Sequence, residues 1–330
     1  FGALNILGIK SALFPKQVFF IFFSFSIFFL VKKIGFNYFK VNCHFFYWLF
    51  VFILVFTYVF GLEVKGSRRW LDLYFFNFQG SEFFKIIFIV FLASFFGHKQ
   101  RRISYLNYFL ISLFYLSIPV FIILHQPDLG NATVYIFIYC SMLLLSQIPK
   151  SLIFRFAALI VFLLPFSWLF MKEYQRHRIL SFISPEIHSQ GTAYNMIQSV
   201  ITVGSGSFLG KGLGLGTQSR LYYLPENFTD FAFASFVEQF GFLGGLLVIG
   251  LFAFLIWQLL QRSWKMSNLN DEDDRINFLY NFGFLAYFIF QTMVNLGMNL
   301  GLLPIAGIAL PFISYGGSSI MAIMFGMALL

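Results

Sequence analysis

The stretch FAFASFVEQFGFLGGLLVIGLFAFLIWQLLQ, residues 231–261, decides the fold of this chain. It is long enough to cross a bilayer as a helix, since about 20 apolar residues suffice. The polar turn Leu224-Pro225-Glu226-Asn227-Phe228-Thr229-Asp230 runs directly into it. Asp230 therefore stands where a polar loop gives way to a predicted membrane helix. A carboxylate at such a position can face both water and lipid, which makes Asp230 the first candidate for chemistry.

The rest of the chain repeats this apolar pattern. Of its 330 residues, 59% are hydrophobic and only 11% are charged, and the mean hydropathy is +0.80. Soluble domains carry about 25% charged residues, so these charges are too few to cover a soluble fold. We predict an all-α polytopic membrane protein with about nine complete spans and a truncated first span. The predicted spans are 1–14 (truncated), 17–31, 44–62, 83–97, 103–124, 132–147, 152–171, 231–261, 276–302 and 315–330.

The spans belong to one domain. We expect a single transmembrane domain over 1–330 that is truncated at both ends, since the chain does not begin with Met. Its one long polar insertion is 172–230. Basic residues of alternate short loops, among them Lys32, Lys33 and Lys40, place those loops in the cytoplasm by the positive-inside rule. The 172–230 loop, which carries the Asp230 motif, is then extracytoplasmic.

The acidic residues are distributed unequally. Of the 13 acids, four form the run 271–274 in a predicted cytoplasmic loop, which is typical of a solvated turn. Random loop decoration would scatter the others, yet all of them are predicted on or just inside the outer side. They are Glu63, Asp72, Glu82, Asp128, Glu173, Glu186, Glu226, Asp230 and Glu238. Polar function is therefore expected on the outer face.

Three candidate acids have both a structural and a functional interpretation. Glu82 and Lys85 are three apart, so on a helix they share a face, and charges in a membrane span usually pair or line a polar cavity. They form a structural ion pair, line a substrate groove, or do both. Asp128 is either a helix N-cap or a metal ligand or structural partner in the same outer cavity as Asp230. Asp230 itself is either a helix cap that the helix dipole stabilises or a general base.

Residues 204–216 form a glycine-dense loop. Glycine allows backbone N–H groups to approach a ligand closely, and successive N–H groups can form an anion nest. The loop is not a Walker motif, because no Gly-Lys-Ser/Thr follows at the required spacing. Arginine suits bidentate phosphate contact, so the basic residues near this loop predict an anionic headgroup site. These residues are Arg68, Arg69, Arg176, Arg178, Lys211 and Arg220.

Distinctive segments follow one another along nearly the whole chain. They are Gly66-Ser67-Arg68-Arg69-Trp70-Leu71, Phe78-Gln79-Gly80-Ser81-Glu82-Phe83-Phe84-Lys85, Gln126-Pro127-Asp128-Leu129-Gly130, Tyr174-Gln175-Arg176, Gly204 through Phe231, and Leu303 through Ser319. In content and order they resemble the SEDS family (shape, elongation, division and sporulation), the RodA and FtsW proteins of bacterial cell-wall synthesis. Tyr174-Gln175-Arg176, Gly214 through Ser219 with its Gly216-Thr217-Gln218-Ser219, and Asn295-Leu296-Gly297-Met298 resemble RodA more than FtsW. Gly80 departs from the family pattern, which usually has Pro there.

The resemblance implies a ten-helix SEDS fold and a peptidoglycan glycosyltransferase. Such an enzyme polymerises lipid II into glycan strands on the outer face of the bacterial cytoplasmic (inner) membrane, for cell elongation and shape. Asp230 matches the essential aspartate of the family, whose implied role is to take the proton from the acceptor sugar's 4-hydroxyl. Gln218 is expected to bind substrate together with the basic residues.

The resemblance also implies cofactors and partners. A divalent cation, Mg or Mn, is expected to offset charge on the pyrophosphate leaving group together with Arg and Lys residues, and no organic cofactor is expected. The partners are lipid II, a class B penicillin-binding protein transpeptidase, the cell-elongation complex and the membrane, with no nucleic acid.

Three other functions compete with this one: an FtsW-type division polymerase, a lipid II flippase, and a scaffold that has lost activity. A transporter should carry ionisable residues across the bilayer depth and on both faces. The predicted intramembrane charges cluster at the outer ends instead, which favours chemistry there. The retained Asp230, Glu82 and Asp128 argue against an inactive scaffold.

Overall fold

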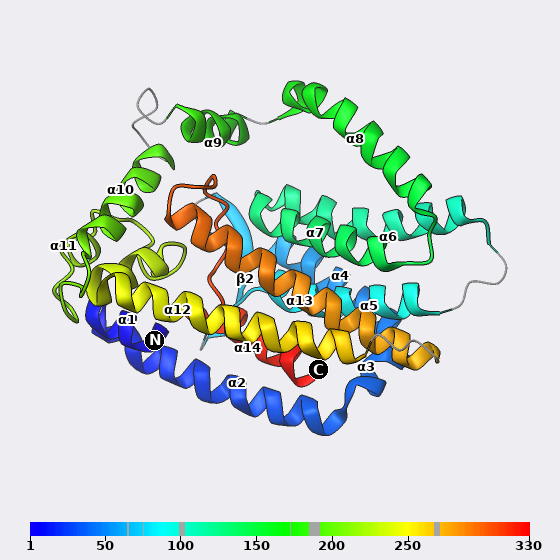
Figure 1. The fold of residues 1–330 in the computed structure, drawn as a ribbon, viewed down its shortest axis with the longest axis horizontal. Coiled ribbons are helices and arrows are strands. Elements are labelled where there is room, and N and C mark those ends of the chain that lie inside the picture. The colour runs from blue at the N-terminus through cyan, green and yellow to red at the C-terminus, as the bar shows by residue number, and fades with distance from the viewer. Residues whose placement is uncertain (65, 75, 99–102, 172, 185–191, 267–270) are drawn as a thin grey trace. The chain divides into compact units, whose positions relative to one another are not determined.

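The structure is a computed structural model and is mainly helical, as predicted (Figure 1). It describes residues 1–64, 66–74, 76–98, 103–171, 173–184, 192–266 and 271–330, without the side chains of residues 164, 167, 170, 174, 177, 178 and 192. Its helices are α1 (Gly2–Ile9), η1 (Ser11–Leu13), α2 (Phe14–Ile34), α3 (Phe36–Val41), α4 (Cys43–Phe60), α5 (Gly80–Gly97), α6 (Tyr105–His125), α7 (Leu129–Leu145), α8 (Lys150–Phe170), α9 (Glu173–Ile183), α10 (Thr192–Ser205), α11 (Thr217–Arg220), α12 (Ala232–Lys265), α13 (Glu272–Asn299) and α14 (Gly317–Ala328). Its strands are β1 (Leu62–Val64), β2 (Ser67–Asp72) and β3 (Asn77–Phe78).

Contacts divide the chain into two compact units. Unit 1 comprises Phe1–Lys16, Pro149–Phe252 and Gln291–Tyr315. Unit 2 comprises Gln17–Ile148, Ala253–Phe290 and Gly316–Leu330. The helices α12 and α13 each contribute residues to both units. Asp230 belongs to unit 1, whereas Glu82, Lys85 and Asp128 belong to unit 2.

Several helices have the length and apolarity of membrane spans. Within the described ranges these are Ser11–Ile34, which includes α2, together with α4, α5, α6 and α12, and two shorter apolar helices are α7 and α14. Large apolar side chains such as Phe22, Phe52 and Phe121 are exposed on these helices (70%, 65% and 65%). Phenylalanine at this density is stable on a helix surface only against lipid, because water would disfavour it. The prediction of a polytopic helical membrane protein is confirmed.

Helix α5 is the core of unit 2. Nearly all of its residues are buried, because α3, α4, α7 and α14 all contact it. A helix that is apolar on every side and buried on every side has no surface left for lipid or water. The two charged residues near its start, Glu82 and Lys85, are consequently buried inside protein.

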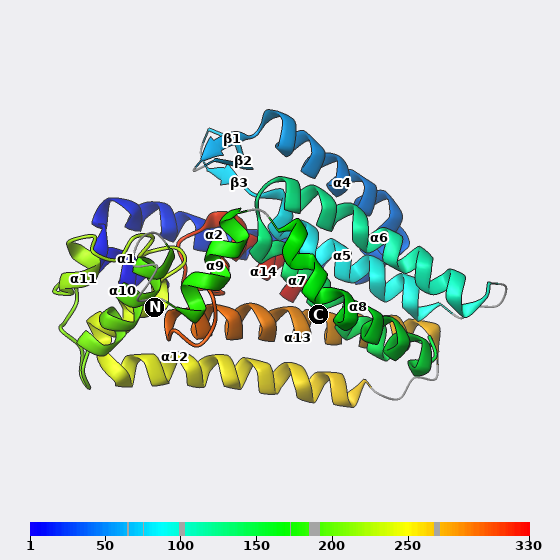
Figure 2. The ribbon, with the colours of Figure 1, turned by 90° about the horizontal axis from the view of Figure 1, so that it is seen from above.

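Some predicted boundaries differ from the structure. Helix α2 begins three residues before the predicted span 17–31 and ends three residues after it, because Phe14, Pro15 and the terminal lysines continue the helix. The predicted span 44–62 ends where the antiparallel sheet β1-β2-β3 begins, and the sheet occupies most of the segment between this span and the span 83–97. Figure 2 shows the sheet near one end of α4. Strands this short carry no readable alternation of apolar and polar residues.

The predicted extracytoplasmic segment 172–230 contains α9, α10 and α11. Helix α10 buries Ala193, Met196, Ser199 and Thr202, which recur every three residues, so that each lies next to the one before it on the helix surface. Half of this buried stripe is hydroxyl residues. A search for apolar runs does not detect such a helix.

Candidate functional site

The turn that carries Asp230 is anchored in the core of unit 1. Leu224 and Phe231, near its two ends, are 0% and 1% exposed and belong to one hydrophobic cluster. Val203 of α10 and Ile305 pack against the same cluster. Because both ends of the turn are buried among apolar side chains, the residues between them have few conformations available.

Two carboxamides of α13 hold the backbone of Asp230. Asn295 Nδ2 donates to the carbonyl oxygen of Asp230 at 3.0 Å, and Asn299 Nδ2 donates to the same oxygen at 3.1 Å. Asn299 Oδ1 accepts from the backbone N–H of Ala234 at 3.0 Å, so it also caps the first turn of α12. Both asparagines are fully buried. The turn therefore cannot rotate about Asp230 without breaking buried hydrogen bonds.

The segment that follows α13 lies beside the carboxylate. Ser314 Oγ donates to the carbonyl of Thr229 at 2.6 Å, which fixes the residue before Asp230. Gly307 has φ +68°, and a Cβ there would lie 3.6 Å from Asp230 Oδ2. The carboxylate thus faces a glycine whose missing side chain leaves space next to it, and Asp230 is half-buried.

Asn295 and Asn299 are not among the site residues that the sequence predicts. A signal for them exists, because they are four residues apart and therefore share a helix face. They also lie within the predicted apolar span 276–302, where a carboxamide is expected only if it is paired or functional. What they pair with is visible only in three dimensions.

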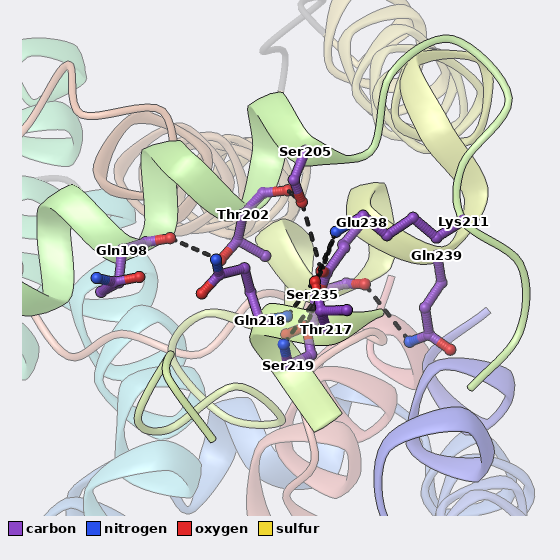
Figure 3. Close-up of polar contacts among 10 residues, drawn as sticks. All are labelled: Gln198, Thr202, Ser205, Lys211, Thr217, Gln218, Ser219, Ser235, Glu238 and Gln239. Atoms are coloured by element: carbon purple, nitrogen blue, oxygen red, sulfur yellow. Dashed lines mark hydrogen bonds and ion pairs between the residues drawn. The ribbon is translucent and has the colours of Figure 1, made fainter. Parts of the chain in front are cut away.

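Glu238 of α12 is the acceptor of a second buried cluster of hydrogen bonds in unit 1. From the sequence it was predicted only to be one of the outer acids. It is 0% exposed and is the one acid in the apolar run 231–261. Figure 3 shows donors from α10, α11 and the loop between them converging on its carboxylate. The donors are Ser205 Oγ (3.4 Å), Lys211 Nζ (3.0 Å), Thr217 Oγ1 (3.5 Å), Gln218 N (2.9 Å), Ser219 N (2.9 Å) and Ser219 Oγ (2.6 Å).

The glycine-dense loop is packed against α12 through its backbone. The amides of Lys211 and Gly212 donate to the carbonyls of Glu238 and Gln239, each at 3.0 Å. The amide of Gly214 donates to Gln239 Oε1 at 3.0 Å. These amides already have acceptors inside the protein, so the interpretation of this part of the loop as an anion nest is wrong.

Three predicted substrate ligands of unit 1, Arg176, Lys211 and Arg220, have partners in the protein. Arg220 Nη1 donates to the carbonyl of Gly214 at 3.3 Å. Arg176 donates from Nε and Nη2 to the carbonyls of Trp168 and Leu169 near the end of α8, at 3.0 and 3.1 Å. Arg220 is exposed, whereas Arg176 is half-buried and also lies 5.8 Å from the centroid of the Trp168 ring. Lys211 contacts Glu238 through its side chain and Gln218 through its backbone amide, while Gln218 Oε1 is buried without a hydrogen-bond partner among the described residues. The side chain of Arg178 lies outside the description, as does Glu186 of the predicted outer acids.

In unit 2 a chain of polar contacts runs from β2 to the start of α5. Arg69 Nη1 pairs with Asp128 Oδ2 at 3.3 Å, and Asn131 Nδ2 donates to the same oxygen at 2.9 Å. Lys85 Nζ then donates to Asn131 Oδ1 at 3.0 Å and to Glu82 Oε1 at 2.7 Å. The two cations and two anions balance, which is what a buried charge cluster requires.

These contacts confirm the structural interpretations of the unit 2 acids. Asp128 is the N-cap of α7, since its side chain accepts from the amide of Asn131 at 3.2 Å. Glu82 and Lys85 form the predicted pair, and Lys85 connects α5 to α7 through Asn131. One atom is left over: Glu82 Oε2 is buried without a hydrogen-bond partner among the described residues. Roles for Glu82, Lys85 and Asp128 in substrate handling stay predictions.

Arg68 is placed differently from Arg69. Arg68 Nη2 pairs with Glu63 Oε2 at 3.0 Å across β1 and β2, and both side chains are at least half exposed. An exposed pair is weak, so Arg68 can exchange this partner for an anionic ligand. Arg69 is committed to Asp128 and to Ser67 Oγ, at 2.9 Å.

The described residues contain no ready-made cluster of acidic, histidine or cysteine ligands. Across the described ranges, no three His, Cys, Asp or Glu side chains come together as a metal-binding group. Mg²⁺ often uses only one or two carboxylates when substrate phosphates supply further ligands. The predicted divalent cation therefore stays a prediction.

Comparison with known proteins agrees with this architecture. A family model described as a cell cycle protein family, covering FtsW, RodA and SpoVE, matches residues 3–330. The chain belongs to this family. The SEDS chain is 38% identical to a probable peptidoglycan glycosyltransferase FtsW of Taylorella equigenitalis, over 82% of this chain and 73% of that protein. It is 35% identical to the peptidoglycan glycosyltransferase MrdB of Escherichia coli, over 85% of this chain and 74% of that protein.

Solved structures share the SEDS fold. One chain of a peptidoglycan synthase complex that coordinates polymerization and crosslinking superposes with a TM-score of 0.82, at 26% identity over 99% of this chain and 91% of that chain. The rod shape determining protein RodA of Thermus thermophilus superposes with a TM-score of 0.71, at 24% identity over 99% of this chain and 90% of that chain. The predicted SEDS family membership and helical fold are confirmed.

Proposed function

We propose that this SEDS protein is a peptidoglycan glycosyltransferase that polymerises lipid II, and that Asp230 is its general base. The observation that carries the proposal is the support of Asp230. Its carbonyl is held by Asn295 and Asn299, while its half-buried carboxylate lies beside Gly307, which has no side chain. A rigid backbone that fixes the position of a carboxylate is what a positioned proton acceptor needs.

In the proposed reaction, the acceptor sugar's 4-hydroxyl oxygen attacks the anomeric carbon of the donor. Asp230 takes the hydroxyl proton as the new glycosidic bond forms. The bond between the anomeric carbon and the pyrophosphate oxygen breaks, and undecaprenyl pyrophosphate leaves with that electron pair. The arginines Arg176 and Arg220 of unit 1 can offset the negative charge on the leaving group.

The family and the membrane helices support a setting for the proposed reaction. We place the active site on the outer face of the bacterial inner membrane, where lipid-linked substrates present their sugars. The partner we propose is a class B penicillin-binding protein, since a structural neighbour belongs to a synthase complex that polymerises and crosslinks. We favour the role in cell elongation that the resemblance to RodA implies. A role in division is the alternative, because relatives named FtsW and MrdB both match.

The test is polymerisation by the purified protein, reconstituted with its penicillin-binding partner and given lipid II. Wild type should produce glycan strands, and Asp230→Asn should lower the rate by more than about 100-fold because the amide cannot accept the proton. Asp274→Asn, in the exposed run 271–274, is the matched control and should retain activity.

Two results would contradict the proposal. Equal polymerisation by Asp230→Asn would remove the general-base role. Movement of labelled lipid II between leaflets without polymer would identify a flippase instead.

A further inference from the structure

Helix α12 is broken at Gly241, and the glycine-dense loop fills the break. Gly241 has φ +71° and ψ −172°, outside the helical region. In a continuous helix the carbonyls of Glu238 and Gln239 would accept from Phe242 and Leu243. Those carbonyls accept from the loop instead, as described above.

The amides on the other side of the break are also satisfied by the loop. Phe242 N donates to the carbonyl of Ser207 at 2.9 Å, and Leu243 N donates to that of Phe208 at 3.3 Å. A membrane helix tolerates a break only where its freed backbone groups find partners in protein. The loop supplies those partners on both sides of the break.

The close approach explains the glycines. A Cβ on Gly210 would overlap the backbone of Gln239, and a Cβ on Gly216 would lie 2.6 Å from Glu238 Oε2. Glycine is required here because the loop backbone touches α12 and the Glu238 carboxylate.

Glu238 completes this contact with its side chain and connects it to the Asp230 turn. Ser219, whose amide and hydroxyl donate to Glu238, accepts at its carbonyl from Asn227 Nδ2 at 2.6 Å. The carbonyl of Asn227 accepts from Ser235 Oγ at 2.7 Å, and Ser235 lies on α12 three residues before Glu238. The contacts form a closed ring from Glu238 through Ser219, Asn227 and Ser235 back to α12. Asn227 is three residues before Asp230.

A carboxylate is the group that suits this position. It accepts from several donors at once, which a neutral carboxamide cannot do because half of its polar atoms are donors. Lys211, 29% exposed at its side chain, balances the charge. Removing the carboxylate would leave the buried amides of Gln218 and Ser219 without a strong acceptor.

We propose that Glu238 is a positioning residue for the proposed glycosyltransferase reaction: its buried carboxylate clamps residues 205–219 onto the broken helix α12 and thereby holds the Asp230 turn in its reactive position. It touches no substrate and acts through Ser219 and Asn227. The proposal rests on the proposed function for its catalytic consequence, whereas the clamp itself is a property of the folded protein.

The experiment compares wild type, Glu238→Gln, Lys211→Met, the double variant and Ser219→Ala. Hydrogen exchange of peptides covering 214–224 is measured without substrate, and kcat and KM are measured with lipid II. Glu238→Gln should speed exchange of 214–224 by about tenfold or more. It should lower kcat by about 100-fold while changing the KM for lipid II less than about threefold, because small misplacements of a catalytic group have effects of that size. Ser219→Ala should shift both readouts in the same direction by a smaller factor.

The double variant separates positioning from charge balance. If Glu238 only neutralises Lys211, removing both charges should restore activity and slow exchange. The clamp predicts that the double variant stays as impaired as Glu238→Gln, because the donors of Gln218 and Ser219 still lack their acceptor. Restoration by the double variant would overturn the proposal, as would unchanged exchange of 214–224 in Glu238→Gln.

Asp230→Asn is the control for the catalytic arm. It should abolish polymerisation without changing the exchange of 214–224. A wild-type protein that makes no polymer would contradict the proposed function alone, because the exchange arm tests the clamp without substrate. If Glu238→Gln does not fold, Ser219→Ala provides the same comparison with the carboxylate still present.

Discussion

At the scale of the residue, the candidate site depends mainly on buried side chains that hydrogen-bond to the backbone of the Asp230 turn. Side chains that face solvent contribute less. Asp230 is fixed through its carbonyl oxygen by Asn295 and Asn299. Asn299 bonds both sides of the junction between the turn and α12, since it also accepts from Ala234 N. A single carboxamide therefore sets both the start of the helix and the position of the candidate base.

Replacing Asn299 should consequently affect stability and activity together. Asn299→Ala leaves the amide of Ala234 without an acceptor and removes one donor to Asp230. We expect a loss of about 1–3 kcal/mol of unfolding free energy and a fall in kcat that exceeds any change in KM. Thermal unfolding in detergent and lipid II polymerisation measure the two effects.

Asn277→Ala is a suitable comparison for Asn299→Ala. Asn277 lies on the same helix, in the part that belongs to unit 2, and it is only half-buried. It should leave kcat close to that of wild type. A normal kcat for Asn299→Ala would show that the turn is held well enough without this contact.

At the scale of the element, α12 consists of two helical segments joined at Gly241. Residues 231–239 are all buried, whereas large apolar residues are exposed from Phe242 onward. The break therefore separates a segment enclosed in protein from one with a lipid-facing surface. The sequence pattern predicted one continuous helix here, because a glycine inside an apolar run gives no sign of positive φ.

Gly241 and Gly250 provide a matched pair for testing the break. Gly241→Ala places a side chain at φ +71° and against the backbone of Gly210, so it should destabilise the protein by more than about 2 kcal/mol. Gly250→Ala meets no atom within 4 Å and should be neutral or stabilising by up to about 1 kcal/mol. Midpoints of thermal unfolding measure the difference. Equal midpoints for the two variants would mean that α12 can straighten without loss.

At the scale of the whole molecule, polar groups are gathered inside each unit while the helix surfaces are apolar. Unit 2 buries the balanced cluster from Arg69 to Glu82, with Lys85 0% exposed. Unit 1 buries Glu238 with its donors. In a membrane protein this arrangement keeps charge away from lipid, where an unpaired charge is costly.

The balance of the unit 2 cluster can be tested by neutralising it stepwise. Lys85→Met leaves Glu82 buried and unpaired, and should cost about 3–5 kcal/mol of unfolding free energy. Glu82→Gln combined with Lys85→Met removes both charges and should recover part of that loss. Glu63→Gln, in the exposed pair with Arg68, should change stability by less than about 1 kcal/mol. A double variant less stable than Lys85→Met would contradict charge balance as the reason for the pair.

The sequence by itself determined the class of protein and much of its local structure. Composition and apolar runs predicted the membrane helices. Local spacing suggested the Asp128 cap and the Glu82–Lys85 pair as structural interpretations, because these contacts depend on residues close together in the chain. Motif order identified the family and pointed to Asp230, whose catalytic role stays a prediction.

Only the tertiary structure decided how the candidate site is held. The contact from Asn299 to Asp230 joins residues 69 positions apart, and Glu238 gathers donors from 19 to 33 positions away. Hydrogen bonds at such separations depend on how helices pack, and spacing along the chain does not reveal them. For the same reason the sequence predicted an anion site in the glycine-dense loop. In the structure the loop amides instead donate to backbone carbonyls at the break in α12.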